Sequence, residues 1–225
     1  MSDLVIVTGG NGQVATALKK LSSDLCYEFC CSDALDICDP QVVGDYFEKI
    51  EPILVINTAA YTAVDDAEKN PESAYRVNKL GPEVLAIACA NAKAPLIHLS
   101  TDYVFSGESN IPYAEDANVC PLSTYGQSKL DGEEGVRTLL VEHVILRVSA
   151  IFSGHADCFP RSILRAALQD SELNVVNDQI AGPTSANSIA WIVDAVARKV
   201  LGGSFIIGTY HFAQQPFVSW YEFAQ

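Results

Sequence analysis

Basic side chains are scarce in this sequence of 225 residues, which has 14 Lys and Arg against 28 Asp and Glu and a net charge of -14. A nucleic-acid-binding surface needs a basic patch, so this imbalance argues against a nucleic-acid partner. No apolar stretch approaches the length that crosses a membrane, and we expect no membrane partner. The acidic charge does not exclude a small anionic ligand, because backbone N–H groups can bind phosphate in an acidic protein.

The N-terminus lacks the features of an export signal. Residues 1–3 are acidic rather than basic, and the apolar run over 4–7 is too short for a signal-peptide core. The seven cysteines are odd in number and include no Cys-x-x-Cys pair. We therefore expect a cytoplasmic protein with reduced thiols. Four cysteines crowd a short span, and we expect these to pack in the interior and hold no metal: Cys26, Cys30, Cys31 and Cys38.

Internal repeats and low-complexity linkers are also absent, as are the motifs of P-loop, nucleophile-elbow and zinc-protease enzymes. The composition, with 49% hydrophobic and 19% charged residues, is that of a globular protein. The length suits one sizeable α/β domain, with or without a small appendage.

Apolar runs of strand length alternate with amphipathic stretches through the first two-thirds of the chain. This order predicts an α/β fold with a doubly wound parallel sheet and helices on both faces. The predicted strands span residues 4–8, 27–31, 53–57, 95–100, 143–148, 173–176 and 208–212. The predicted helices span 13–21, 39–50, 70–91 with Asn70 as its N-cap, a segment containing 125–129, then 160–169, 187–201 and a start at 220.

A glycine-rich turn follows the first predicted strand and precedes the first predicted helix. Glycines there let the backbone approach a pyrophosphate, and the helix start supplies N–H groups with a partial positive charge. The spacing is Gly-x-x-Gly-x-x-Ala, ending at Ala15, which favours a dinucleotide site over a plain turn. The candidate cofactor-binding residues of the turn are Gly9, Asn11, Gly12, Gln13 and Val14.

An acidic residue about twenty positions past such glycines is typical of a site for the ribose of NAD. Asp33 holds that position after the second predicted strand, and Asp36 is the competing acid. No Lys or Arg lies close to them in the sequence to bind a 2′-phosphate, which favours NADH over NADPH. The segment 57–68 leaves the third strand with small residues, which suit either a cofactor lying close or a plain loop and helix cap.

A tyrosine and a lysine four residues apart, Tyr125 and Lys129, share one face of a predicted helix. A cation near a phenol favours the phenolate and lowers the tyrosine pKa from about 10, so that the phenol can exchange a proton near neutral pH. Alone, the pair also fits a solvated lysine beside a half-buried tyrosine. Thr101 ends the fourth strand at the carboxyl edge of the sheet, where the Tyr–Lys pair is also expected. Its presence there favours a catalytic role for the pair over the simpler interpretation. By contrast, we expect His98, His143 and His211 to be packed core or edge residues.

Six segments are spread along nearly the whole chain: 12–14, 57–68, 100–105, 125–129, 178–184 and 219–224. They resemble the extended short-chain dehydrogenase/reductase family, and within it the dTDP-4-dehydrorhamnose reductases. The resemblance implies a Rossmann fold, an NADPH or NADH cofactor and a nucleotide-sugar substrate. It implies reduction of the 4-keto group of dTDP-4-dehydro-6-deoxy-L-mannose, and it weakens the preference for NADH.

Residue roles also follow from the resemblance. Tyr125 would give a proton to the 4-keto oxygen, Lys129 would lower the pKa of Tyr125 and hold the nicotinamide ribose, and Thr101 would hydrogen-bond the same oxygen. Further cofactor-binding residues would be Ala59, Ala60, Tyr61 and Asn78, and substrate-binding residues would be Val64, Asp102 and Tyr103. A homodimer is the assembly to test.

We expect a dinucleotide-binding domain over residues 1–150 and a substrate-binding region over 151–225, interleaved with the last elements of the sheet. The family continues beyond 220–224, so we expect the second region to be small and incomplete. Ala150 stands where members usually have Trp, and Cys158 stands where they usually have Asn. Two alternatives stay open: a non-catalytic relative like the methionine adenosyltransferase β subunit, and an epimerase or dehydratase of nucleotide sugars.

Overall fold

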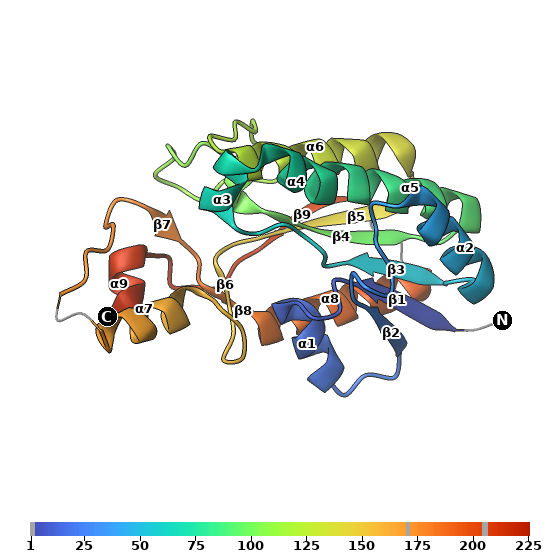
Figure 1. Ribbon diagram of the computed structural model, residues 1–225, viewed down its shortest axis with the longest axis horizontal. Coiled ribbons are helices and arrows are strands. Elements are labelled where there is room, and N and C mark those ends of the chain that lie inside the picture. Colours follow the sequence, from blue (N-terminus) through green and yellow to red (C-terminus); the bar gives the residue numbers. More distant parts are fainter. Residues whose placement is uncertain (1–2, 170–171, 204–206) are drawn as a thin grey trace.

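The computed structural model describes residues 3–169, 172–203 and 207–225. A parallel sheet forms its centre, with the strand order β2-β1-β3-β4-β5-β9 (Figure 1). The predicted doubly wound fold is confirmed, and each of these strands begins and ends within one residue of its predicted bounds. The strands are β1 (Leu4–Thr8), β2 (Cys26–Cys30), β3 (Leu54–Asn57), β4 (Leu96–Thr101), β5 (His143–Val148) and β9 (Gly208–Phe212).

Helices cover both faces of the sheet (Figure 1). The side chains of β1 alternate between the two faces: Val5 and Val7 pack in the core on one face, and Ile6 packs in the core on the other. All three side chains are fully buried. Both faces are therefore apolar and need helices to cover them. The helices on the first face are α1 (Gln13–Lys20) and α8 (Ala186–Leu201), and those on the second are α2 (Pro40–Ile50), α5 (Gly81–Ala92) and α6 (Thr124–Leu139).

The predicted helix over 70–91 is interrupted. The structure has α3 (Val64–Lys69), α4 (Pro71–Tyr75), a π-helical turn over Arg76–Leu80 and then α5. Pro82 explains the wide turn, because proline has no N–H to donate to the preceding turn of a helix. Asn70 is the N-cap residue of α4, as predicted, but its side chain makes no capping bond, and its amide instead donates to Asp66 of α3 over 3.0 Å.

The last part of the chain forms small paired elements, on the left of Figure 1. The predicted strand over 173–176 was wrong, since these residues form no strand. Instead the Val176 carbonyl accepts a single bond from the Tyr221 N–H, outside any ladder. The elements are β6 (Ile151–Phe152) paired with β8 (Thr184–Ser185), β7 (Ile180–Ala181) paired with β10 (Val218–Ser219), and the helices α7 (Phe159–Ala167) and α9 (Trp220–Ala224).

The strand order reverses beside β1. The chain passes from β1 to β2 on one side and then returns to β3 on the other side of β1. Doubly wound folds bind ligands at such a point, outside the carboxyl ends of the strands. Among the described residues, none of the helices combines the length and apolar character needed to span a bilayer.

Candidate active site

The turn after β1 approaches the segment after β3 backbone to backbone. Gly9 has a φ of 70°, in the left-handed region that favours glycine. The Gly12 N–H donates to the Gly9 carbonyl over 2.8 Å and closes the turn. A Cβ on Gly9 would lie 2.6 Å from the backbone nitrogen of Ala59, so no other residue fits there without movement.

α1 starts directly after this turn without a side-chain cap. Gly12 is its N-cap residue, so no side chain accepts from the first N–H groups of the helix. These N–H groups suit the phosphates of a dinucleotide. The Gln13 Oε1 atom is buried and has no hydrogen-bond partner within the described parts of the chain, so it can accept from a hydroxyl or amide of such a ligand.

A cavity of about 270 Å³ opens beside this turn, where the strand order reverses. Its lining combines the glycine turn, the segment after β2 and the segment after β3, so the residues present fit a dinucleotide. The predicted cofactor-binding residues that line it are Gly9, Asn11, Gly12, Asp36, Ala59 and Ala60.

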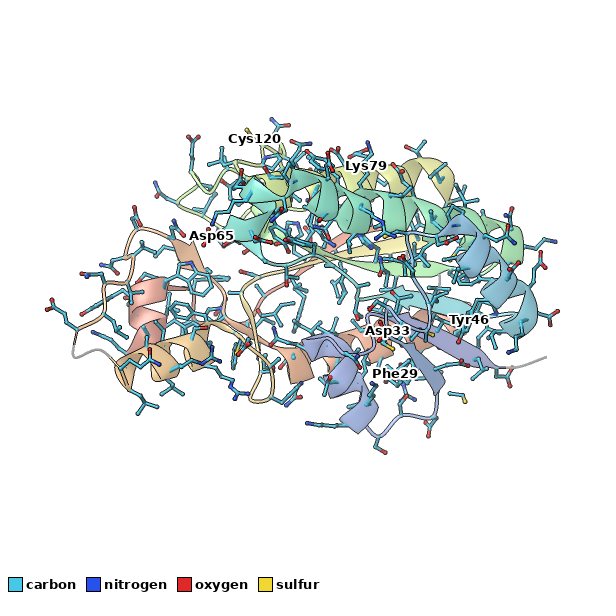
Figure 2. The ribbon with its side chains drawn as sticks, in the orientation of Figure 1. Phe29, Asp33, Tyr46, Asp65, Lys79 and Cys120 are labelled. Atoms are coloured by element: carbon cyan, nitrogen blue, oxygen red, sulfur yellow. The ribbon has the colours of Figure 1, made fainter. Side chains whose placement is uncertain are left out.

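Asp36, rather than Asp33, lies at the cavity. Asp33 is exposed after β2 (Figure 2) and is not part of the lining. Val14 is 5% exposed and packs in the core beneath α1, so it seats the helix. The expectation that no cation lies near Asp36 was wrong, because Arg76 Nη2 lies 2.7 Å from Asp36 Oδ2. Arg76 is 40 positions away in the sequence, and only the fold brings the two together.

Replacing Gly9 with alanine should weaken binding of NADPH by at least about tenfold and destabilise the protein by about 1–3 kcal/mol, because the new Cβ must displace Ala59 at a strained φ. The matched control is Gly44→Ala, since a Cβ on Gly44 of α2 meets no atom within 4 Å. That variant should gain about 0.5–1 kcal/mol of stability and keep its affinity. Fluorescence titration and urea unfolding measure both effects. Unchanged affinity in Gly9→Ala would contradict the assignment.

Thr101, Tyr125 and Lys129 converge at the carboxyl end of β4. Thr101 is the last residue of that strand, and the other two are in the first two turns of α6, which packs against it. They are 6%, 9% and 2% exposed, respectively. The Lys129 ammonium donates to the Leu99 carbonyl over 2.7 Å and is thereby fixed to β4. The Thr101 hydroxyl accepts from the Tyr103 N–H over 3.2 Å.

Burial has the largest influence on the pKa values of Tyr125 and Lys129. It raises the pKa of Tyr125 to about 12, while the Thr101 hydroxyl lowers this pKa and the Asp102 charge raises it further. Burial lowers the pKa of Lys129 to about 8, against the carboxylate of Glu133, which raises it. The expected net lowering of the Tyr125 pKa is therefore not seen in this structure, because loss of hydration outweighs the groups that lower it.

Lys129 should make stability depend on pH. The native pKa is about 8 and the ordinary value is 10.5, so between these pH values the unfolded state binds more protons. Stability relative to a Lys129→Met variant should therefore rise by about 1–3 kcal/mol from pH 8 to pH 10. Urea unfolding of both proteins at several pH values measures this difference. A difference that stays constant would contradict a buried, destabilised ammonium.

Predicted site residues surround Tyr125. Tyr61 and Val64 pack against it in one apolar cluster with α3 and α4. The Tyr103 ring meets the Tyr125 ring edge to face, with 5.5 Å between centroids. The fully buried Asn78 fixes this group, because its amide accepts from the Tyr61 N–H over 2.8 Å and donates to the Tyr61 carbonyl over 3.0 Å. Asn78 thus positions the segment after β3.

A larger cavity, of about 480 Å³, lies at the carboxyl ends of β5 and β9. Asp102, the residue after Thr101, lines it and accepts from the Ser149 hydroxyl. Burial raises the pKa of Asp102, while the hydroxyls of Ser149 and Thr101 lower it. His211 also lines the cavity, although the sequence pattern indicated only a packed or edge histidine.

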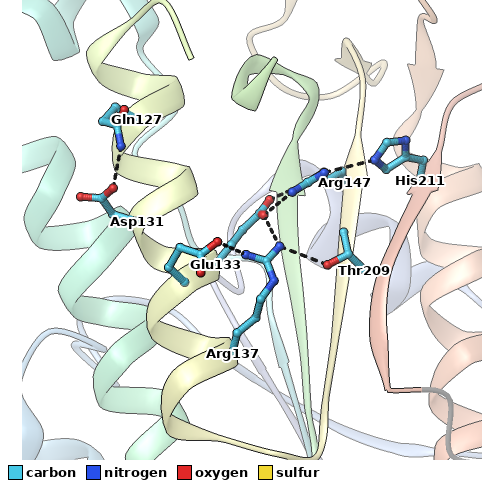
Figure 3. Close-up of polar contacts among 8 residues, drawn as sticks. Gln127, Asp131, Glu133, Arg137, Arg147, Thr209 and His211 are labelled. Carbon is cyan, nitrogen blue, oxygen red and sulfur yellow. Dashed lines mark hydrogen bonds and ion pairs between the residues drawn. The ribbon is translucent and has the colours of Figure 1, made fainter. Parts of the chain in front are cut away.

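A buried ion network links this cavity to α6 (Figure 3). Glu133 binds Arg147 through two hydrogen bonds of 2.9 and 2.7 Å, and Arg137 Nη2 donates to the same carboxylate over 2.6 Å. Arg147 extends the network to His211 Nε2 at 3.4 Å. Sequence reasoning missed this network. The available signals were Glu133, four residues after Lys129 on the same helix, and an arginine inside an apolar strand.

The fold and this arrangement of side chains define a Rossmann-type protein of the extended short-chain dehydrogenase/reductase class. Comparison with known proteins shows which family within this class the chain belongs to. The family model described as "RmlD substrate binding domain" matches residues 3–225, and the chain belongs to this family.

Several relatives carry one name. The dTDP-4-dehydrorhamnose reductase of Aggregatibacter actinomycetemcomitans is 40% identical over 98% of this chain and 76% of its own length. That of Escherichia coli K12 is 34% identical over 98% of this chain and 75% of its own length. The crystal structure of the Bacillus anthracis enzyme in complex with NADP has a TM-score of 0.92 and 34% identity, covering 100% of this chain and 79% of that one.

Proposed function

We propose that this chain is an NADPH- or NADH-dependent reductase that converts dTDP-4-dehydro-6-deoxy-L-mannose to dTDP-L-rhamnose. The observation that carries the proposal is the convergence of Thr101, Tyr125 and Lys129 on a sheet edge that also holds a dinucleotide cavity and a larger second cavity. The names of the relatives support the substrate, and the NADP complex of the Bacillus anthracis enzyme supports the cofactor.

The proposed catalytic residues are Thr101, Tyr125 and Lys129. Tyr125 donates its phenol proton to the 4-keto oxygen, and the Thr101 hydroxyl donates a hydrogen bond to the same oxygen as negative charge develops there. The raised pKa of Tyr125 keeps the phenol protonated at neutral pH, so the proton is in place beforehand. Lys129, with a pKa of about 8, is charged at pH 7 and stabilises the phenolate left behind. Bound nicotinamide supplies the hydride.

The cofactor-binding assignments combine the glycine turn with the segments after β2 and β3. The uncapped start of α1 binds the pyrophosphate, and Asp36 at the cavity binds the ribose in preference to the exposed Asp33. The other proposed cofactor-binding residues are Gly9, Asn11, Gly12, Gln13, Val14, Ala59, Ala60, Tyr61 and Asn78. The proposed substrate-binding residues are Val64, Asp102 and Tyr103.

We further propose that residues 1–150 bind the cofactor and residues 151–225 contribute to the substrate site. The net charge of -14 supports a protein that works without nucleic acid. A cytoplasmic location and a homodimer complete the proposal. Size-exclusion chromatography with light scattering tests the homodimer.

The reductase proposal is tested by mixing the purified protein with NADPH or NADH and dTDP-4-dehydro-6-deoxy-L-mannose. We expect the absorbance of the reduced nicotinamide to fall only when the sugar nucleotide is present, with dTDP-L-rhamnose as the product. A protein that binds the cofactor without consuming it would be a regulatory relative, and one that retains NAD while interconverting sugars would be an epimerase. Either result would overturn the proposal.

A further inference from the structure

An ion pair lies at the cofactor cavity, on the side lined by the segment after β2. Asp36 lines the cavity, and its Oδ2 atom lies 2.7 Å from Arg76 Nη2. Asp36 Oδ1 accepts from the Cys38 N–H over 2.9 Å, so the carboxylate has a fixed orientation. The Cys38 thiol donates to the Arg76 carbonyl over 3.2 Å and holds the π-helical turn beside the same segment.

The two charges favour different ligands. A carboxylate accepts hydrogen bonds from a ribose diol, as at the acidic position of NAD sites, but repels a phosphate group. A guanidinium is planar, is always charged and binds phosphate through paired N–H donors. The Arg76 guanidinium donates to Asp36 through one nitrogen atom, Nη2. Because the Arg76 side chain is 57% exposed, its other N–H donors are accessible.

Arg76 is the cation best placed for a phosphate at this side of the cavity. Neither Lys nor Arg is among the described residues that line the cavity. Lys19 of α1 donates to the Gly10 carbonyl over 2.6 Å and lies over the Phe29 ring, 5.1 Å from its centroid. Its ammonium is thus bound to the glycine turn. Within the described parts of the chain, the Arg76 guanidinium pairs with Asp36 alone, in a surface ion pair that is weak and easily exchanged.

We propose that the Asp36–Arg76 pair determines which nicotinamide cofactor binds, an inference that rests on the proposed function. Asp36 accepts from the 2′-hydroxyl of NADH while Arg76 neutralises its charge. With NADPH, Arg76 exchanges Asp36 for the 2′-phosphate. The pair therefore admits both cofactors, whereas an acid alone would exclude NADPH.

The test is a fluorescence titration that gives the Kd of NADPH and of NADH for the full chain and three variants. Arg76→Ala should weaken NADPH by about tenfold or more and change NADH by less than about threefold. Asp36→Asn should weaken NADH by about fivefold or more and leave NADPH unchanged or tighter. The matched control is Lys79→Ala, because Lys79 (labelled in Figure 2) is in the same π-helical turn, but its ammonium lies 3.9 Å from the Asp131 carboxylate of α6.

Salt gives an independent readout. Between low and high ionic strength, the Kd of NADPH should rise more steeply than that of NADH in the wild-type protein, and Arg76→Ala should remove this difference. Equal losses of both cofactors in Arg76→Ala, or an unchanged ratio in both variants, would overturn this inference and leave the reductase proposal intact. Failure of the wild-type protein to bind either cofactor would overturn the proposed function and this inference with it.

Discussion

Replacing Tyr125 with phenylalanine should lower the rate of sugar reduction by about 10²–10⁴-fold, because the reaction loses its proton donor. The aromatic ring stays, so its edge-to-face contact with Tyr103 and its packing against Tyr61 and Val64 are retained. The fold and the Kd of NADPH should therefore change little. Steady-state kinetics, nicotinamide binding and thermal unfolding of the same preparation separate these effects.

The matched control for that experiment is Tyr75→Phe, which removes a phenol hydroxyl on the neighbouring helix α4. Its activity should stay close to that of the wild-type protein. A Tyr125→Phe variant that turns over like the wild-type protein would show that another group delivers the proton.

Replacing Glu133 with leucine should have the largest effect on stability, a loss of about 3–5 kcal/mol, because it leaves a buried guanidinium without its partner. Glu133 is fully buried and Arg147 is 4% exposed. Burial raises the pKa of Glu133, but the hydrogen bonds and charge of Arg147 outweigh it and hold this pKa below its ordinary value. Urea unfolding near neutral pH measures the loss.

Two variants make this prediction specific. Glu134→Leu changes the adjacent residue, whose side chain is 62% exposed and pairs with Arg137, and should cost less than about 1 kcal/mol. The double variant Glu133→Leu with Arg147→Met removes both buried charges and should recover much of the lost stability. If the double variant is as unstable as Glu133→Leu, the loss comes from packing and not from an unpaired charge.

The sheet could be predicted closely because its strands are short apolar runs. Leu4–Thr8 and His143–Val148 match their predicted bounds, since burial on both faces requires continuous apolar residues and turn signals limit each run. The prediction of one helix over 70–91 failed for two reasons. Asn78 binds the Tyr61 backbone, a tertiary contact that the sequence does not reveal, and Pro82, a local signal that the prediction passed over, lacks the N–H that a regular helix needs.

The candidate site likewise has a part that the sequence predicts and a part that only the fold reveals. The glycine turn and the Thr101, Tyr125 and Lys129 set have fixed spacings within local elements, so the sequence indicates them. The Asp36–Arg76 pair joins residues 40 positions apart, and the Glu133–Arg147 pair joins a helix to a strand. No periodicity encodes such contacts. The pKa of Tyr125 likewise depends on the depth of burial, which the spacing to Lys129 does not reveal.

In the proposed reaction, C4 of the sugar receives the hydride that bound nicotinamide supplies, and Tyr125 supplies the proton to the oxygen. The measurement uses NADPH that carries deuterium at both C4 positions of the nicotinamide, incubated in ordinary water with dTDP-4-dehydro-6-deoxy-L-mannose, and mass spectrometry of the sugar product. We expect one deuterium, at C4 of dTDP-L-rhamnose, and no product from Tyr125→Phe above a small residual rate. A product without deuterium, or deuterium at another carbon, would contradict the account.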